Sequence, residues 1–362
     1  MNKFKFSNAF LFVIMALVFG GLAGFLVLII LGTSNFNLPF IGQMKFSSGE
    51  DNRQIIIEQP RSVIVEQQVQ LQQIEDDLFP ALISVYAPKK STNILDQAFL
   101  PSDVLSQGFM ITADGWLLTT DRVPVAGKNL PVVVGYQNKQ YAITQAISDK
   151  AYGLVFAKVS AGNLPVAQLG KASDLNVGQP VVIVSQRNTL SLTTIRKIGY
   201  QFVKADDLIF SSDLPSKQVF LSSPLDNSLE GAIVADLKGE IIGIIHNGKV
   251  ILSDYFTAAI NGVLQNKVIS RPQLGIKYLD LAQADGLISI GDKGAYVVGN
   301  PAKDSPAGAK IKDGDIIEKV NDQELNAFTG LAEQIALFKP GDRIELTFLR
   351  KGREASVSVT LK

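Results

Sequence analysis

The sequence predicts a mainly β protein with one N-terminal membrane helix and two strand-rich units after it. Three observations support this prediction. Ala9–Leu31 is an unbroken apolar run, the region from Ala81 onward contains short β-branched segments between turns, and Arg271–Lys362 forms a further strand-rich unit. Short strands at this spacing favour a β-barrel or a sandwich over alternating strands and helices.

The composition excludes several classes of function. Lys and Arg total 34 and so do Asp and Glu, so the formal net charge is zero and no basic surface for nucleic acid is indicated. There is no Cys, which excludes disulfides and thiol catalysis. His246 is the single His, so a metal site with two His ligands is excluded as well. We therefore expect no nucleic-acid partner, no metal and no cofactor.

Residues 9–31 are predicted to form a single-pass transmembrane helix that contacts the lipid bilayer. As a helix, this run would be roughly 35 Å long, enough for a hydrocarbon core of about 30 Å. Lys3 and Lys5 precede the run and no Lys or Arg follows it until Lys45. This asymmetry places residues 1–8 in the cytoplasm and the main body of the protein outside the cell membrane. The alternative is a cleaved signal peptide, but the run is longer than a usual signal core and no clear Ala-x-Ala site follows.

A linker and a helix are predicted between the membrane segment and the first strands. Residues 32–64 mix Asn, Ser, Gly, Pro and charged residues without sustained periodicity, as linkers do. Val65–Leu78 has apolar residues spaced mainly by three or four, which predicts an amphipathic helix that Pro80 ends.

Two segments of the strand-rich region carry a recognisable pattern. Ser106–Asp121 reads SQGFMITADGWLLTTD, and Asp226–Gly243 reads DNSLEGAIVADLKGEIIG. Both resemble signature segments of the HtrA/Deg family, trypsin-like serine proteases that carry C-terminal PDZ domains. Leu164–Gln186 and Asp254–Leu264 also follow the family pattern. The resemblance implies a trypsin-like double β-barrel over residues 65–268 and a PDZ domain over residues 271–362.

The resemblance also implies that the catalytic triad is missing. Residue by residue, the His position falls on Arg122, the Asp position on Gly153 and the Ser position on Leu229. Arg stays protonated and cannot act as a base, Gly has no side chain, and Leu is inert. His246 follows the Ser segment, whereas the chymotrypsin-type order is His, Asp, Ser, so we interpret it as a residue at the end of a strand.

One position leaves catalysis open as an alternative. Asp226-Asn227-Ser228 keeps an Asn-Ser pair, so a one-residue insertion would bring Ser228 near the position of the nucleophile. Without its two partners, such a Ser loses most of its activity, because removing Ser or His from a triad costs roughly a millionfold. An ordinary turn residue is the simpler interpretation of Ser228. Glu230 in place of a Gly also argues against an intact oxyanion turn.

The C-terminal unit resembles a bacterial PDZ domain, with Ser305-Pro306-Ala307 and Asp313-Gly314-Asp315 as landmarks and a helix over Phe328–Phe338. In such domains an extended peptide adds to a sheet edge, and its carboxylate binds backbone N–H groups. The carboxylate-binding loop corresponds to Gln273-Leu274-Gly275-Ile276, and Leu331 and Ile335 would line an apolar pocket. The alternative is that these apolar residues simply pack the core.

The sequence thus suggests a membrane-anchored pseudoprotease of protein quality control. Its PDZ domain would bind protein C-termini or unfolded peptide segments of extracytoplasmic proteins, and the resemblance implies a homotrimer. Two alternatives are an active endopeptidase that uses Ser228, and an adaptor or decoy that assembles with an active relative.

Overall fold

The computed structural model describes residues 15–23, 36–38, 42–44, 61–125, 131–185, 189–284, 293–326 and 329–362. The chain divides into two compact units, Met1–Arg61 and Ser62–Lys362. In the first unit residues 15–23 are helical, and strand β1 (Phe36–Leu38) pairs antiparallel with β2 (Gly42–Met44). The predicted linker therefore contains a short two-stranded pairing.

The predicted membrane segment is only partly covered by the described residues. Residues 15–23 are helical with exposed side chains, and the rest of residues 9–31 lies outside the described part of the chain. Within that part, no helix combines the length and the apolar character that crossing a bilayer requires.

The second unit begins with helix α2 (Arg61–Leu78), which starts four residues before the predicted helix. Its C-terminal half packs on the barrels through Ile74 and Leu78, which are 1% exposed, whereas Val69 on the predicted apolar face is 59% exposed. A short turn of 3-10 helix with Pro80 follows, so the helix ends where the sequence predicts.

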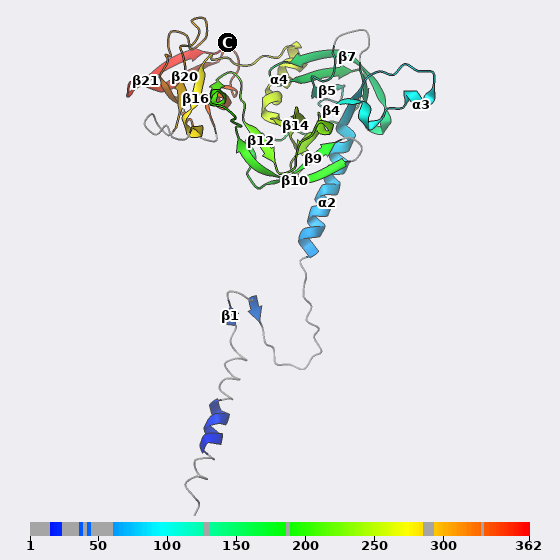
Figure 1. Cartoon of the computed structure of the whole chain (residues 1–362), viewed down its shortest axis with the longest axis vertical. Helices are drawn as coiled ribbons and strands as arrows, with labels where there is room; N and C mark the ends of the chain where they lie inside the picture. Colours follow the sequence, from blue (N-terminus) through cyan, green and yellow to red (C-terminus); the bar gives the residue numbers. More distant parts are fainter. Residues whose placement is uncertain are drawn as a thin grey trace, which may run out of the picture. The chain divides into compact units, whose positions relative to one another are not determined.

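Two closed antiparallel barrels follow α2 (Figure 1). The first has the strand order β3-β4-β5-β8-β7-β6, formed by Leu82–Tyr86, Val104–Met110, Trp116–Thr120, Leu154–Val159, Gln140–Asp149 and Val132–Val134. The second has the order β10-β12-β15-β14-β13-β9, formed by Thr189–Gly199, Gln218–Leu221, Lys249–Leu252, Ile241–His246, Ile233–Ala235 and Pro180–Ser185. The predicted double β-barrel is therefore present.

The barrels share a core that fixes the ends of their strands. Phe109 and Phe156 of the first barrel and Ile244 of the second lie in one buried cluster with Phe256 of helix α4 (Ser253–Asn266). The rings of Phe109 and Phe256 lie 6.1 Å apart. Because β5 and β8 of the first barrel and β14 of the second all contribute buried residues to this cluster, the turns at their ends are held in place.

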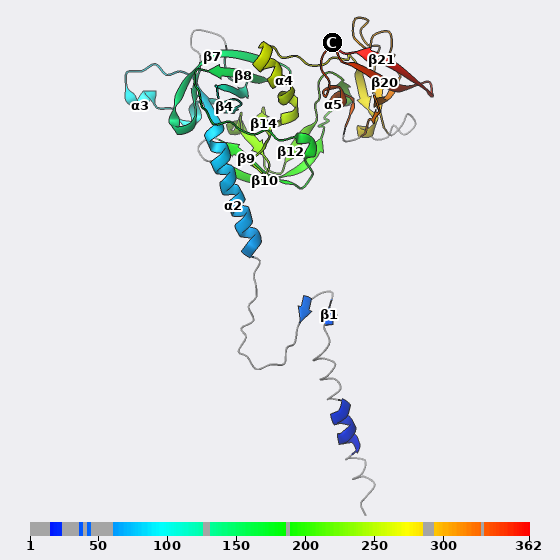
Figure 2. The same ribbon diagram turned by 180° about the vertical axis from the view of Figure 1, so that it is seen from behind.

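A third sheet follows the barrels, in the order β11-β16-β17-β18-β20-β21, with β19 paired to β18. Its strands are Ile209–Ser211, Lys277–Asp280, Ala295–Val297, Ile316–Val320, Arg343–Arg350, Arg353–Thr360 and Gln323–Glu324. Helix α5 (Leu331–Ile335), labelled in Figure 2, packs against β18. This helix is shorter than the predicted Phe328–Phe338, and residues 327–328 lie outside the described chain.

The edge strand β11 is the unexpected member of this sheet. It belongs by sequence to the barrel region, between β10 and β12, yet it pairs with β16 of the C-terminal unit.

The remaining short helices are α3 (Ile94–Gln97) and the 3-10 turns Phe79–Ala81, Pro101–Asp103, Tyr136–Asn138, Ala172–Asp174, Ala205–Leu208, Asn227–Leu229 and Leu281–Gln283.

Candidate functional site

The ends of two paired strands bring Arg122 and Gly153 together. Thr120 at the end of β5 pairs with Leu154 at the start of β8. One residue beyond this pair, the Asp121 N–H donates to the carbonyl of Gly153 at 2.9 Å. The ladder therefore places the turn that carries Arg122 beside the turn that carries Gly153.

His246, at the end of β14, occupies the space that a side chain on residue 153 would need. A Cβ added to Gly153 would lie 2.3 Å from His246 Nε2 and 3.3 Å from Asp121 Oδ2. Gly153 also has a φ of +66°, a left-handed conformation that favours Gly. A larger residue is thus excluded at 153 as long as the imidazole keeps its position.

Glu230 is the buried carboxylate of this site. Its Oε1 lies 2.7 Å from His246 Nδ1, and its Oε2 accepts from the Asn247 N–H at 3.1 Å. The side chains of Glu230 and His246 are 5% and 8% exposed. A buried carboxylate needs partners of this kind because desolvation without them would be costly.

Four side chains close into a polar ring, which we define as Arg122, Asn247, His246 and Glu230. Arg122 Nη2 donates to Asn247 Oδ1 at 3.2 Å, and Asn247 Nδ2 lies 2.9 Å from His246 Nε2. His246 Nδ1 then reaches Glu230 Oε1, and Glu230 Oε2 returns to Arg122 Nε at 3.4 Å. An ionised carboxylate only accepts, so Nδ1 of His246 donates to Glu230. The amide nitrogen of Asn247 only donates, so Nε2 of His246 accepts from it.

The pKa of Glu230 reflects two opposed effects. Burial raises it, but hydrogen bonds from His246, Thr120 and Asn247 outweigh burial and hold the pKa below its usual value. Glu230 is therefore ionised at neutral pH, which agrees with its role as an acceptor in the polar ring.

The turn that would form an oxyanion hole has its N–H groups engaged within the turn itself. The Ser228 N–H donates to Asp226 Oδ1 at 2.8 Å, and the N–H groups of Leu229 and Glu230 donate to the carbonyls of Asp226 and Asn227 at 3.2 and 3.4 Å. Oxyanion stabilisation needs free donors that converge on one point. This 3-10 turn presents none at these three positions.

The sequence-predicted positions separate in the structure. Arg122 and Gly153 meet at the polar ring, whereas Leu229 is half-buried against the core of the second barrel. Ser228 is exposed and its hydroxyl donates to Asp226. From the sequence, Glu230 is identified only as a replaced Gly and His246 only as a strand-end residue. The available signal is that Glu230 is the one acidic residue among the small and apolar residues 228–235.

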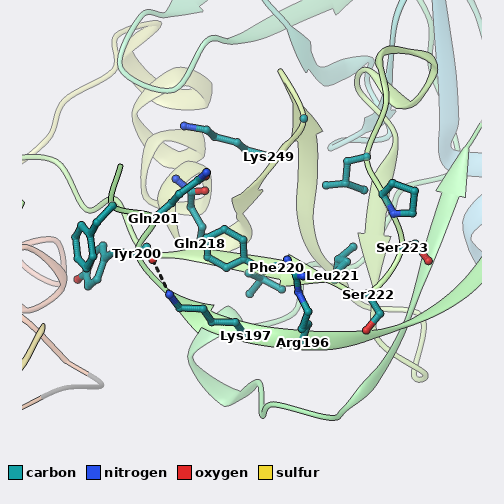
Figure 3. A pocket seen from close by; sticks show the side chains of 15 residues that line it. Arg196, Lys197, Tyr200, Gln201, Gln218, Phe220, Leu221, Ser222, Ser223 and Lys249 are labelled. Atoms are coloured by element: carbon teal, nitrogen blue, oxygen red, sulfur yellow. Dashed lines mark hydrogen bonds between the residues drawn. The ribbon is translucent and has the colours of Figure 1, made fainter. Parts of the chain in front are cut away.

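A cavity of about 360 Å³ opens beside the polar ring, and its lining includes Gly153, His246, Asn247, Tyr152 and Tyr255. A larger one of about 850 Å³ runs along β10 and β12, where Figure 3 shows Lys197 reaching the backbone carbonyl of Tyr200. None of the sequence-predicted site residues lines this larger cavity.

The predicted peptide-binding residues come together, but they are not exposed. Leu274, Ile276, Leu331 and Ile335 are at most 1% exposed and belong to one core cluster. The loop N–H groups of Leu274 and Gly275 donate to Asp213 Oδ1 at 2.7 and 2.9 Å. Gln273 instead exchanges backbone hydrogen bonds with Lys362 at the end of the chain.

Comparison with known proteins agrees with this architecture. A family model for the PDZ domain matches residues 272–361. A "probable periplasmic serine endoprotease DegP-like" of Hahella chejuensis is 28% identical over 272 residues, which are 70% of this chain and 56% of that protein. The "serine protease Do-like HtrA" of Lactococcus lactis subsp. cremoris is 25% identical over 277 residues, 68% of this chain and 67% of that protein. The match thus spans little more than half the length of the DegP-like relative.

Solved structures show the same fold. The structure described as "HtrA-type protease AlgW with decapeptide" has a TM-score of 0.56 and 20% sequence identity, and the match covers 80% of this chain and 97% of that one. The PDZ match, the curated relatives and the two barrels joined to a third sheet support an HtrA/DegP-type architecture, in which a trypsin-like double barrel precedes a PDZ domain.

Proposed function

We propose that this chain is a non-catalytic HtrA-type protein, whose barrels serve as a scaffold and whose PDZ domain binds peptide segments of extracytoplasmic proteins in protein quality control. The observation that carries the proposal is the closed polar ring. Each of its four side chains hydrogen-bonds or ion-pairs with two others, so the single imidazole of the chain is already engaged at both nitrogens.

The ring also suggests which residue replaces the nucleophile. In a working triad the Ser hydroxyl is hydrogen-bonded to the His. Here Arg122, at the His position, forms an ion pair with Glu230, whereas Leu229 packs against the core of the second barrel. We infer that an Arg–Glu ion pair stands in place of the His–Ser pair, with His246 filling the space above Gly153. A guanidinium cannot accept a proton at neutral pH, so this pair cannot start acyl transfer.

The proposal is tested with the full chain solubilised in a mild detergent. Fluorescent casein and a fluorophosphonate probe are incubated with the wild-type protein and with Ser228→Ala, and trypsin serves as the positive control. We expect no cleavage and no labelling above a no-protein blank in either sample. Cleavage by the wild type that Ser228→Ala abolishes would show that the chain is an enzyme.

The second candidate function is an endopeptidase that uses Ser228. The observation in its favour is that the Ser228 hydroxyl has an acceptor, the Asp226 carboxylate. However, the hydrogen bonds from Ser228 hold the pKa of Asp226 below its usual value, and a carboxylate of low pKa is a poor general base near neutral pH. The casein experiment separates this candidate from the first.

Assembly and attachment are further parts of the proposal. A homotrimer is suggested by family resemblance, and light scattering of the purified chain measures it directly.

An adaptor role, in which this chain forms mixed assemblies with an active relative, predicts that such a relative co-purifies with it. Membrane anchoring by residues 9–31 rests on the apolar run of the sequence, and it predicts that the protein stays in the pellet after alkaline carbonate extraction.

A further inference from the structure

A segment of the barrel region lies where a PDZ ligand would bind. We call Ile209–Asp213 the docked segment. Ile209 pairs with Leu279, Phe210 with Tyr278 and Ser211 with Lys277, all antiparallel, so β11 extends the sheet beyond β16. Adding a strand to a free sheet edge is the way in which a PDZ domain takes an extended peptide.

The end of the docked segment fills the carboxylate-binding loop. The Asp213 carboxylate accepts from the N–H groups of both Leu274 and Gly275 through one oxygen. Ser212 continues the ladder, because its N–H donates to the Ile276 carbonyl at 2.9 Å and its hydroxyl accepts from the Ile276 N–H at 2.9 Å. Three successive loop N–H groups are thus satisfied by two side chains of another part of the chain.

One side chain of the docked segment is an apolar anchor. Phe210 is 8% exposed and belongs to the same core cluster as Leu331 and Ile335. Its ring lies 4.5 Å from that of Tyr200 and 5.7 Å from that of Tyr278. The neighbouring Ile209 and Ser211 are exposed, as expected for a strand with one face on the core.

Contacts on both sides of the docked segment tie its ends to the barrels. Before it, Lys197 donates to the Tyr200 carbonyl at 2.9 Å, and after it the Tyr152 hydroxyl donates to the Pro215 carbonyl at 3.1 Å (Figure 3 shows the first contact). A tethered ligand has a high effective concentration, so it competes strongly with free peptide.

We propose that Ile209–Asp213 is a built-in ligand of the PDZ groove, in which the Asp213 carboxylate takes the place of a C-terminal carboxylate and must be displaced before an outside peptide can bind. The inference rests on the proposed peptide-binding function of the groove. An outside peptide then binds with an affinity lowered by the fraction of molecules in which the groove is open.

The first test compares the wild type with Asp213→Ala, and Asp206→Ala is the matched control because this exposed carboxylate lies in the same loop. Two labelled peptides serve as probes. The first, KADDLIFSSD, copies residues 204–213, and the second has Val in place of its last residue, Asp. Fluorescence anisotropy measures their affinity for the full chain in detergent. We expect both to bind Asp213→Ala about tenfold or more tightly than the wild type or Asp206→Ala.

The second test locks the segment in place. Ser211 and Lys277 are exposed cross-strand partners, and the chain has no Cys of its own, so Ser211→Cys with Lys277→Cys places one thiol pair across β11 and β16. We expect oxidation to close this disulfide and to abolish binding of both peptides, and reduction to restore it. Each single Cys variant is the control and should respond to neither treatment.

Hydrogen exchange of residues 271–280, followed by mass spectrometry, reports on the groove without any peptide. Protection in the wild type that Asp213→Ala lowers supports the docked segment. Unprotected exchange in the wild type, or equal peptide affinity in the wild type and Asp213→Ala, overturns it. If exchange shows the expected difference but no variant binds either peptide, the docked segment stands and the proposed peptide-binding function is wrong.

Discussion

His246 Nδ1 lies 2.7 Å from Glu230 Oε1, and both side chains are buried where the two barrels meet. These residues come from β14 and from the turn before β13, and Arg122 reaches the same carboxylate from the first barrel. The ionised Glu230 carboxylate therefore contacts His246 of the second barrel and Arg122 of the first barrel.

Glu230→Ala should destabilise the fold. It leaves His246 buried without its acceptor and Arg122 without its ion-pair partner, although the Arg122 side chain is 39% exposed and can be solvated. We expect the free energy of unfolding to fall by about 2–3 kcal/mol. Urea denaturation followed by tryptophan fluorescence measures it. Asp206→Ala is the exposed control, and a loss for Glu230→Ala no larger than for this control would contradict the polar ring.

Gly153→Ala should clash with His246. The new Cβ would lie 2.3 Å from Nε2, in addition to the cost of a left-handed φ, so we expect a loss of about 2–4 kcal/mol. Gly178→Ala is the matched control, because Gly178 has a φ of +85° and nothing within 4 Å of its added Cβ.

The same clash predicts a coupling between residues 153 and 246. In a His246→Ala background, Gly153→Ala should cost only the backbone penalty of about 1–2 kcal/mol, which Gly178→Ala measures separately. A double-mutant cycle by urea denaturation gives the coupling energy. Strict additivity of the two substitutions would show that the imidazole does not fill this space.

Asp280 should make stability depend on pH. Burial is the main cause that raises its pKa to about 6, and the charge of Glu333 raises it further. The hydrogen bond from the Ala282 N–H and the charge of Lys217 act in the opposite direction and lower the pKa. The folded state then holds a proton that the unfolded chain loses, so stability falls as the pH rises from about 4 to about 6. The shift corresponds to about 3 kcal/mol.

The pH dependence is measured by urea midpoints between pH 4 and 8 for the wild type and Asp280→Asn. The Asn side chain can still accept from the Ala282 N–H but does not titrate in this range. We expect the difference between the two proteins to grow with pH and to level off above pH 7. A difference that is constant over the whole range would contradict the raised pKa.

Arg271→Lys should loosen the junction between the barrels and the PDZ domain. Both terminal nitrogens of Arg271 donate hydrogen bonds to the Asp149 carboxylate. The guanidinium lies 4.9 Å from the centre of the Tyr152 ring. Asp149 is 2% exposed, so it depends on this partner. Lys keeps the positive charge but cannot form the bidentate hydrogen bonds of Arg, so we expect the free energy of unfolding to fall by about 2–4 kcal/mol. Limited proteolysis near residues 268–270 should become faster, whereas Arg353→Lys on an exposed strand should leave the rate unchanged.

The double barrel and the PDZ domain could be predicted from the sequence because their evidence is local. Arg122 follows β5 and Gly153 precedes β8, and the register of these two paired strands brings the two turns together. The boundaries of two helices differ from the prediction. Helix α2 begins at Arg61 and α5 ends at Ile335, because capping and packing, and not periodicity alone, decide where a helix begins and ends.

The site itself depends on contacts between residues that are distant in sequence. Arg122 and Asn247 are 125 positions apart, and Asp213 and Leu274 are 61 apart. No periodicity or motif links such pairs, because only the packing of one barrel on the other, or of β11 on β16, brings them within hydrogen-bond distance. The sequence by itself determined the double barrel and the PDZ domain, through local patterns of strands and turns. Only the tertiary structure decided that Arg122, Asn247, His246 and Glu230 form one polar ring and that β11 pairs with β16 at the edge of the third sheet.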